Sequence, residues 1–278
     1  MIWQTSRFDI DLTVPRVMGI VNLTPDSFSD GGRHDSTVAG LRHAEQLLRD
    51  GADILDVGGE STRPGAPLVP AEEEWRRVEG FLHEVLRWQV PVSIDTWKPE
   101  VMRQALALGV DIVNDIRALQ EPGAQALVTA HRRCGVCLMH MHRDPQTMQQ
   151  APMQGDVVAQ VSAFLAQRAQ ALRLDGVQAS RIVLDYGIGF GKTVAQNFSL
   201  LAQQAELMEL GYPLLAGWSR KSSLGAVLAR EGQLLEPAQR QIASVAAALL
   251  AVERGARVVR VHDVLETVQA LKVWSSAR

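Results

Sequence analysis

Residues 181–192 have the sequence RIVLDYGIGFGK. The apolar run 182–184 lies between a polar residue and a turn, which predicts a short buried strand. Asp185 ends that strand, and a buried carboxylate is costly unless a partner stabilises it. Three of the next six residues are glycines, which let the backbone bend and let a ligand approach closely. The stretch therefore predicts a strand that delivers an acidic side chain to a pocket, although an aspartate that caps a turn has the same pattern.

The same unit, a short apolar run followed by a helical segment, recurs eight times. We expect strands at residues 17–21, 54–57, 90–94, 111–116, 136–141, 182–184, 214–218 and 258–261. We expect helices at residues 38–49, 72–88, 99–108, 124–131, 157–174, 194–210, 222–229, 238–253 and 264–274. Strands that alternate with helices pair in parallel.

Eight such units in 278 residues predict an α/β fold, a closed (β/α)₈ or TIM barrel. We expect a single domain over 1–278, with the barrel from about residue 16 onward and a short N-terminal hairpin or plug within 3–13. A doubly wound sheet is the alternative, but no G-x-G-x-x-G motif follows the first strand.

Composition excludes several classes of protein. The net charge of −3 argues against a broad nucleic-acid-binding or anionic-membrane-binding surface. The longest apolar runs are too short to span a membrane, and the N-terminus lacks a signal-peptide core. Cys134 and Cys137 form a C-x-x-C pair without a second pair to complete a zinc site, so we interpret them as reduced structural thiols. We therefore expect a cytoplasmic protein.

Polar residues follow nearly every predicted strand, and the site of a (β/α)₈ barrel lies at those carboxyl ends. The acids that could reach the barrel mouth, with one amide, are Asp56, Asp95, Asp115, Asp185 and Asn114. Such groups suit a flat heterocycle with several N–H donors, because a carboxylate accepts two parallel N–H bonds. The opposing cations are Arg63, Lys221, Arg260 and His262, and they suit a phosphorylated or carboxylated ligand. Other polar groups at these strand ends are Asn22, His140, His142, Ser219, Arg220 and Asp263, and Ser222 begins a helix whose free N–H groups suit an anion.

Two long loops follow the first two strands. Residues 23–32, LTPDSFSDGG, are polar and turn-rich, which predicts a mobile lid. Residues 60–70, ESTRPGAPLVP, contain three prolines that stiffen the loop. Both loops are predicted to border the same mouth, although an ordinary surface loop remains the alternative for the second.

Eight motifs together resemble the dihydropteroate synthase family of pterin-binding enzymes, from Arg16 to the final helix. They are MGIVNLTPDSFSDGG (18–32), DVGGESTRPG (56–65), SIDT (93–96), IVNDI (112–116), LMHM (138–141), DYGIGFGK (185–192), GWSRKS (217–222) and RVHDV (260–264). The first, second and seventh are highly specific in combination. The resemblance implies the condensation of 6-hydroxymethyl-7,8-dihydropterin diphosphate with 4-aminobenzoate in folate biosynthesis, with Mg²⁺ as cofactor.

The resemblance also implies a role for each matched residue. Asp95, Asn114 and Asp185 would hold the polar edge of the pterin, Met139 and Arg260 would pack near its ring, and Lys221 would bond to its carbonyl. The diphosphate would lie against Asn22, Arg63, Arg260 and His262, with Asn22 also on Mg²⁺. The aminobenzoate site would consist of Thr62, Pro64, Phe190, Lys221 and Ser222, with Asp26 and Phe28 closing it. Ile116 and Gly217 would also line the substrate site, and the residues assigned to catalysis are Asn22, Arg63, Asp95, Lys221, Arg260 and His262.

Two residues depart from the family pattern. Tyr186 stands where the family has proline, so it either loosens Asp185 or points outward. Trp218 is bulkier than expected and is predicted to face the helices.

Two rival functions are a folate-dependent methyltransferase on the same barrel and a non-catalytic pterin-binding paralogue. The resemblance further implies a sulfonamide target and a homodimer, which residues 241–253 or the last helix could form.

Overall fold

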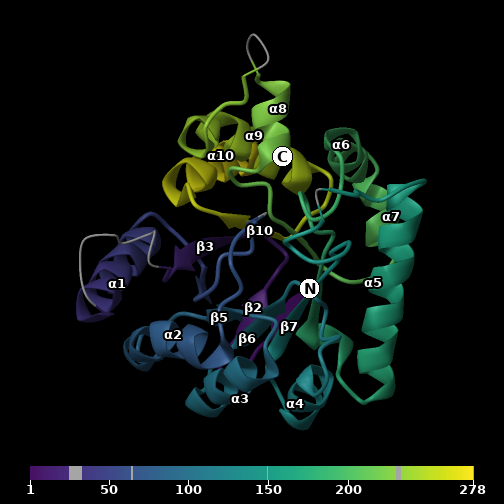
Figure 1. The fold of residues 1–278 in the computed structure, drawn as a ribbon. Helices are drawn as coiled ribbons and strands as arrows, with labels where there is room; N and C mark the ends of the chain where they lie inside the picture. The colour runs from purple at the N-terminus through teal and green to yellow at the C-terminus, as the bar shows by residue number, and fades with distance from the viewer. Residues whose placement is uncertain (25–32, 64, 149, 230–232, 278) are drawn as a thin grey trace.

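The computed structural model describes residues 1–24, 33–63, 65–148, 150–229 and 233–277 as a closed barrel of eight parallel strands surrounded by helices (Figure 1). The barrel strands are β3 (Arg16–Asn22), β4 (Ile54–Gly58), β5 (Val92–Asp95), β6 (Ile112–Asp115), β7 (Gly135–Met139), β8 (Ile182–Asp185), β9 (Leu214–Ala216) and β10 (Val258–Val261). Neighbours in the barrel follow chain order, and β10 closes it against β3. The predicted (β/α)₈ fold is therefore confirmed, and the doubly wound sheet is excluded.

The helices are α1 (Arg33–Arg49), α2 (Ala71–Val85), α3 (Pro99–Leu108), α4 (Ala124–Ala130), α5 (Val157–Leu174), α6 (Val194–Ala202), α7 (Gln204–Met208), α8 (Ser222–Val227), α9 (Gln241–Glu253) and α10 (Val264–Ser276). Short 3₁₀ turns at Ala179–Arg181 and Pro237–Arg240 precede β8 and α9. In the described part of the chain, no helix combines the length and apolar character needed to cross a membrane.

The prediction of one continuous helix over 194–210 is wrong, because the chain breaks at Gln203. Gln203 has φ −105° and ψ 24°, which ends α6 before α7 begins. The next residue, Gln204, is fully buried, and its Nε2 donates to the carbonyl oxygens of Ala251 at 2.9 Å and Arg254 at 3.0 Å. These bonds join the side chain of Gln204 to α9 and to Arg254, the residue directly after α9. They fix Gln204 in an orientation that one straight helix over 194–210 would not need.

Two layers of side chains line the barrel interior, because alternate residues of a strand point to the same face. The lower layer is apolar and buried, and it consists of Met18, Ile54, Ile112, Cys137, Val183, Leu215 and Val258. Two positions further along four of these strands stand Asp56, Asn114, Asp185 and Arg260. The apolar layer therefore forms a floor beneath polar groups near the carboxyl ends of the strands.

The N-terminal residues close the bottom of the barrel. Strands β1 (Ile2–Gln4) and β2 (Asp9–Asp11) form an antiparallel hairpin. Trp3, Ile10 and Leu12 of this segment pack against the lower layer, and Trp3 Nε1 donates to the carbonyl oxygen of Arg181 at 3.0 Å. The predicted hairpin is confirmed, and it also serves as the plug.

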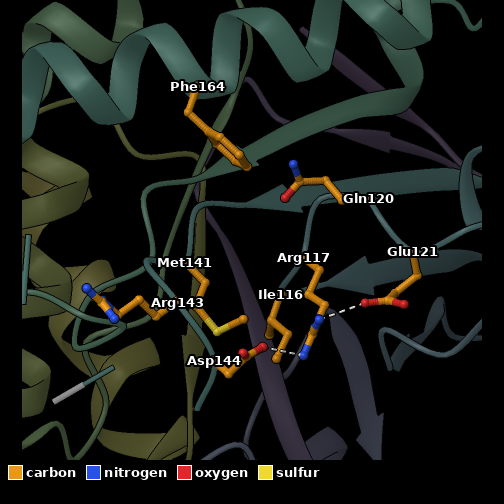
Figure 2. A pocket seen from close by; sticks show the side chains of 8 residues that line it. All are labelled: Ile116, Arg117, Gln120, Glu121, Met141, Arg143, Asp144 and Phe164. Carbon is orange, nitrogen blue, oxygen red and sulfur yellow. Dashed lines mark hydrogen bonds and ion pairs between the residues drawn. The ribbon is translucent and has the colours of Figure 1, made fainter. Parts of the chain in front are cut away.

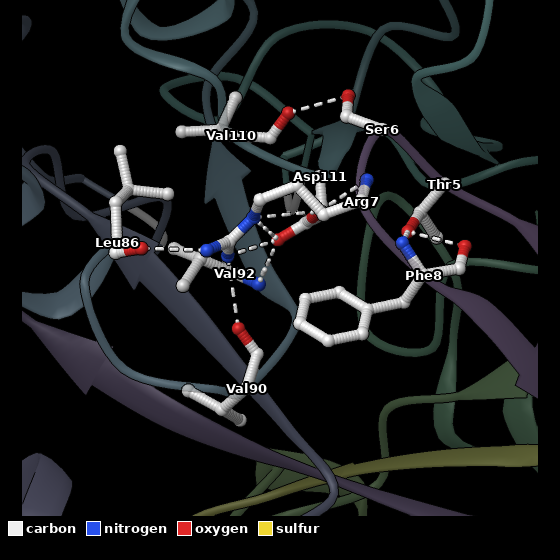
Figure 3. Close-up of polar contacts among 9 residues, drawn as sticks. All are labelled: Thr5, Ser6, Arg7, Phe8, Leu86, Val90, Val92, Val110 and Asp111. Carbon is white, nitrogen blue, oxygen red and sulfur yellow. Dashed lines mark hydrogen bonds and ion pairs between the residues drawn. The ribbon is translucent and has the colours of Figure 1, made fainter.

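Arg7, between the two hairpin strands, ties the plug to the barrel (Figure 3). Its Nη2 donates to Asp111 Oδ2 at 2.5 Å and to the carbonyl oxygen of Val90 at 2.9 Å. Its Nη1 reaches the carbonyl oxygen of Leu86 at 2.6 Å. Asp111 Oδ2 also accepts from the amide of Val92 at 2.9 Å, so one buried carboxylate joins the hairpin to the start of β5.

Trp3→Ala should lower the free energy of unfolding by about 3–5 kcal/mol, because it leaves a large cavity in the barrel floor. Urea denaturation monitored by circular dichroism measures the change. The control is Ile2→Ala, because Ile2 is 45% exposed and its loss should cost no more than about 0.5 kcal/mol. Equal effects of the two substitutions would contradict the plug.

Candidate functional site

Arg260 on β10 joins the acidic groups of the upper layer. Its Nε donates to Asp56 Oδ2 at 2.5 Å, and its Nη2 donates to Asp95 Oδ2 at 2.6 Å. Asn114 on β6 donates its Nδ2 to Asp56 Oδ2 at 3.2 Å. Side chains from β4, β5, β6 and β10 thus meet inside the mouth, and three of them, Asp95, Asn114 and Arg260, belong to the predicted site.

The charges in this cluster influence each other strongly. Burial, the largest influence, raises the pKa of Asp95 to about 7 against the pull of Arg260, and Asp56 adds to the rise. Burial opposes the charge of Arg260, but Asp56 and Asp95 outweigh it and raise the Arg260 pKa. One guanidinium between two carboxylates leaves an excess of acceptors, which suits a ligand edge that presents N–H donors.

Asp185 lies at the end of β8 and is held by its own loop. Its Oδ1 accepts a hydrogen bond from the amide of Gly187 at 2.7 Å. Burial raises the pKa of Asp185, whereas the Gly187 amide and the charges of Lys221, Arg260 and Lys192 lower it. A Cβ on the nearby Gly217 would lie 3.9 Å from Asp185 Oδ2, so this predicted site residue lines the same space.

Gly187 must be glycine for two reasons. Its φ is +65°, in the region that side chains disfavour. A Cβ at this position would collide with the carbonyl oxygen of His140. The glycine-rich loop therefore docks directly on the end of β7, as the three glycines predict.

An apolar patch adjoins the polar cluster. Ile116, Met139, Met148 and Phe190 pack together and are all buried. Lys221 Nζ lies 4.1 Å from the centroid of the Phe190 ring, a cation–π arrangement. Burial, followed by the charge of Arg260, lowers the pKa of Lys221 to about 8. The structure thus brings four more predicted residues, Ile116, Met139, Phe190 and Lys221, to one wall of the site.

His262 occupies the basic part of the mouth. Its Nδ1 lies 2.9 Å from Ser219 Oγ, which also accepts from the His262 amide at 3.1 Å. Burial lowers the pKa of His262 to about 3, and the positive charges of Arg220, Arg260, Arg63 and Lys221 add to the effect. The ring is therefore neutral near pH 7 and is surrounded by cations.

The remaining predicted residues lie around the rim. Asn22 ends β3 and is half-buried, Thr62 is half-buried in the loop after β4, Arg63 is exposed, and Ser222 is the first residue of α8. Within the described part of the chain, no side-chain hydrogen bond or ion pair joins any of these four residues to another. Asp26, Phe28 and Pro64, and all but the first two residues of the predicted lid 23–32, lie outside the described residues.

Asp115 does not reach the mouth, which corrects the prediction. Its Oδ1 accepts from the amide of Arg117 and its Oδ2 from the amide of Leu119, both at 2.7 Å. His140 likewise points away, with its ring centroid 4.9 Å from that of Phe164 on α5 in an edge-to-face arrangement. Both residues follow an inward-facing neighbour on the same strand, and adjacent strand residues face opposite sides.

Two further groups of the strand ends have structural partners. Arg220 Nη2 donates to Asp263 Oδ1 at 2.6 Å, so these two charges satisfy each other. Trp218 is buried with its ring 5.2 Å from that of Phe198 on α6, which confirms that it faces the helices.

Tyr186 points outward into the helical layer. It is fully buried, and its hydroxyl donates to Gln204 Oε1 at 2.9 Å. This bond ties the residue after Asp185 to α7, so the residue that replaces the family proline is anchored by a side chain.

A cavity of about 250 Å³ lies beside the site (Figure 2). Arg117 in its wall donates to Glu121 Oε1 and to Asp144 Oδ1, both at 2.7 Å. Of the predicted site residues, only Ile116 lines this cavity. The cavity is therefore a neighbour of the polar cluster and does not coincide with it.

Sequence reasoning missed two features of the site. Asp56 was recognised only as a strand-end acid, although it is the shared partner of Arg260 and Asn114. Lys192 is buried behind the glycine-rich loop, and its only sequence signal is its place at the end of that motif.

The fold and this arrangement define a (β/α)₈ barrel whose mouth carries a buried polar cluster beside a group of basic residues. The family model for "Pterin binding enzyme" matches residues 18–262. Dihydropteroate synthase of Neisseria meningitidis serogroup C is 51% identical over 278 residues, which cover 99% of this chain and 97% of the relative. The chain belongs to the pterin-binding enzymes, among the dihydropteroate synthases.

Two solved structures agree with this assignment. Burkholderia cenocepacia dihydropteroate synthase complexed with 7,8-dihydropteroate has a TM-score of 0.88 and 50% identity, covering 100% of this chain and 96% of its own. The Yersinia pestis enzyme with a sulfonamide drug has a TM-score of 0.92 and 42% identity, covering 100% of this chain and 99% of its own.

In the ligand-free protein, the ring protons of His262 should not titrate between about pH 5 and pH 8, because the pKa of about 3 keeps the ring neutral there. Proton NMR across this range measures the chemical shifts, and His262→Gln identifies the signal by its disappearance. A midpoint near the ordinary histidine value would contradict the described environment.

Proposed function

We propose that this chain condenses 6-hydroxymethyl-7,8-dihydropterin diphosphate with 4-aminobenzoate, giving 7,8-dihydropteroate and diphosphate, at the mouth of the barrel. The observation that carries the proposal is the buried polar layer in which Asp56, Asp95 and Asn114 meet Arg260 opposite Asp185. Such a layer matches a flat ring with an amino-pyrimidinone edge, and the nearby cations match a diphosphate.

The pterin ring is proposed to bind deepest. Asp185 accepts the N–H groups of its amino-pyrimidinone edge as an ionised carboxylate, and Asp95 and Asn114 complete the polar contacts. Lys221 bonds to the ring carbonyl. Met139 and Ile116 provide apolar contact to the ring, and Gly217 leaves room for it, because a Cβ there would face Asp185.

The diphosphate is proposed to lie against the basic rim formed by Asn22, Arg63, Arg260 and His262. His262 is neutral in the empty site, so it offers an N–H donor without competing for the acids. Arg63 lies close enough to affect the pKa values of both Lys221 and His262. The positive charges of Arg63 and Arg260, with hydrogen bonds from Asn22 and His262, stabilise the charge that develops as the diphosphate leaves.

Mg²⁺ is proposed to reach the site with the substrate. The described residues contain no group of three His, Cys, Asp or Glu side chains that could hold a metal ion. This fits Mg²⁺, which usually keeps several waters and binds through one or two protein oxygens plus substrate phosphates. Asn22 would supply the protein ligand, and bound Mg²⁺ would neutralise charge on the diphosphate.

The aminobenzoate is proposed to bind above the pterin, against Phe190 and Lys221, with Thr62 and Ser222 as further contacts. The family resemblance assigns Pro64, Asp26 and Phe28 to the same site, and these three lie outside the described residues. The C–O bond to the diphosphate breaks, and its electron pair leaves with the diphosphate. The amine nitrogen of aminobenzoate then bonds to the exposed carbon and loses a proton to solvent. The residues act by holding both partners in line and by excluding water, without a covalent enzyme intermediate.

Diphosphate release should require both substrates and Mg²⁺, and excess EDTA should abolish it.

Asp185→Asn should weaken pterin binding roughly tenfold to a hundredfold, because an amide cannot accept both N–H groups of the edge. Isothermal titration with a pterin analogue measures the affinity, with Asp144→Asn on the neighbouring cavity as the control.

Four outcomes would contradict the proposal. Unchanged affinity in Asp185→Asn would remove that residue from the pterin site. Pterin binding without diphosphate release would favour the non-catalytic paralogue. Methyl transfer to or from a reduced folate would favour the methyltransferase. Sulfonamides should compete with aminobenzoate, and inhibition that aminobenzoate does not relieve would move its site elsewhere.

A homodimer is proposed to form through α9 and α10. Ile242 is 84% exposed and Val273 is 73% exposed, which is unusual for large apolar side chains. Ile242, Val245 and Ala246 line a hollow of about 290 Å³ that Glu266 of α10 borders. A second copy would bury this surface.

We also propose a cytoplasmic location, since Cys134 and Cys137 are both buried free thiols.

Ile242→Asp should convert the proposed dimer to a monomer, because it places a charge where apolar surface would be buried. Light scattering after size exclusion measures the mass. Leu174→Asp is the matched control, since Leu174 is 79% exposed at the end of α5. A monomeric wild type, or a dimer that survives in Ile242→Asp, would contradict the proposed interface.

A further inference from the structure

Lys192 is almost completely buried directly after the glycine-rich loop. Its Nζ lies 2.8 Å from the carbonyl oxygen of Gly187, 3.2 Å from that of Phe190 and 3.3 Å from that of His140. A fourth partner, His140 Nδ1, is 3.0 Å away. None of these contacts is with a carboxylate, so Lys192 is not part of a buried ion pair of the usual kind.

The four acceptors around Lys192 favour the protonated form. A lysine ammonium has three N–H donors, whereas a neutral amine has two and a lone pair that carbonyl oxygens repel. Burial lowers the pKa of Lys192 to about 7, and the charge of Asp185 opposes this effect. His140 has its pKa lowered to about 3 by burial and by Lys192, so its ring is neutral and can accept.

Through the loop, these bonds reach two residues of the proposed site. Gly187 accepts from Lys192 with its carbonyl oxygen, and its amide donates to Asp185 Oδ1 at 2.7 Å. Phe190 accepts from Lys192 with its carbonyl oxygen, and its ring faces Lys221. One ammonium group behind the loop therefore fixes both a pterin-binding carboxylate and an aminobenzoate-binding ring.

Two close backbone approaches show how tightly the loop is docked. A Cβ on Gly187 would collide with the His140 carbonyl oxygen, and one on Gly191 would lie 2.5 Å from that of His142. These approaches bring carbonyl dipoles together at the end of β7. The ammonium group of Lys192 contacts the carbonyl oxygens of His140, Gly187 and Phe190 and offsets their mutual repulsion, which explains why a lysine is buried there.

Lys192 also acts on Asp185 through its charge. The charged groups that lower the pKa of Asp185 are Lys221, Arg260 and Lys192. The thiol of Cys137, in the layer below Asp185, is neutral, because burial and the nearby charge of Asp185 raise its pKa well above the ordinary value. His142 and Lys221 are the other titratable groups near Lys192, and loss of the Lys192 charge leaves Asp185 easier to protonate.

We propose that Lys192 is a positioning residue: from behind the site, its ammonium group holds the loop 187–191 so that Asp185 and Phe190 face the substrates. This inference rests on the proposed pterin and aminobenzoate sites. It assigns Lys192 no contact with either substrate.

The test compares Lys192→Met with Lys192→Gln, which keeps two N–H donors but lacks the charge. The affinity for a pterin analogue is expected to fall at acidic pH as Asp185 takes up a proton, and we call this fall the acidic limb. In both variants the midpoint of the acidic limb should move up by about one pH unit, because Asp185 protonates more easily. Lys192→Met should also raise KM for aminobenzoate about tenfold, and Lys192→Gln should raise it less. Isothermal titration at several pH values and the diphosphate-release assay provide the two measurements.

Lys98→Met is the matched control. Lys98 is also buried, but its Nζ binds Glu60 Oε2 at 2.8 Å and Glu74, away from the glycine-rich loop. The Lys98→Met variant should be less stable, but the midpoint pH of the fall in pterin affinity should not change. Thermal melting identifies variants that fail to fold, and Lys192→Gln decides the question if Lys192→Met is one of them.

An unmoved acidic limb in a folded Lys192 variant would overturn the inference, and so would an equal shift in Lys98→Met. Asp185→Asn separates this failure from failure of the proposed function. If Asp185→Asn loses pterin affinity while the Lys192 variants do not, only the role of Lys192 is wrong. If Asp185→Asn binds normally, the pterin site itself is misplaced.

Discussion

The site depends on one cation, Arg260, held between Asp56 and Asp95 inside the barrel. Two carboxylates in a dry interior repel each other and would take up protons without a positive partner. The planar guanidinium meets both at once, and Asn114 donates to Asp56 as well. The same charge also favours ionised Asp185. A single arginine on the last strand therefore makes an acidic interior compatible with folding and still leaves acceptors for a ring.

The barrel could be predicted from sequence because its signal is local and repeated. Each strand is a short apolar run, and each run is followed by a helical segment, so order and parallel pairing follow directly. The direction of individual side chains could not be predicted, because a shift of one residue reverses every face of a strand. Asn114 and Asp115 are the last two residues of β6, yet only Asn114 faces the polar cluster. Met139 and His140 are likewise neighbours, yet Met139 packs in the apolar wall of the site and His140 packs against Phe164 of α5.

Contacts between side chains that lie far apart in the sequence could not be predicted either. The break at Gln203 depends on bonds from Gln204 to Ala251 and Arg254, which nothing near residue 203 encodes. The acceptors around Lys192 include His140, which lies 52 residues away along the chain, so only the fold brings them together. The roles of rim residues came from the family resemblance, and their geometry shows which of them meet. Tyr186 illustrates the limit, since only its bond to Gln204 explains how proline is replaced.

The plug has a consequence for the order in which the molecule assembles. Trp3 is synthesised long before Leu215 and Val258, yet it packs in one cluster with both of them. Its binding surface exists only once β9 and β10 have closed the ring, and contacts so distant along the chain form slowly. The hairpin is therefore synthesised first and packs into the barrel last. Until then the tryptophan stays in water, and its fluorescence would report the moment at which the barrel closes.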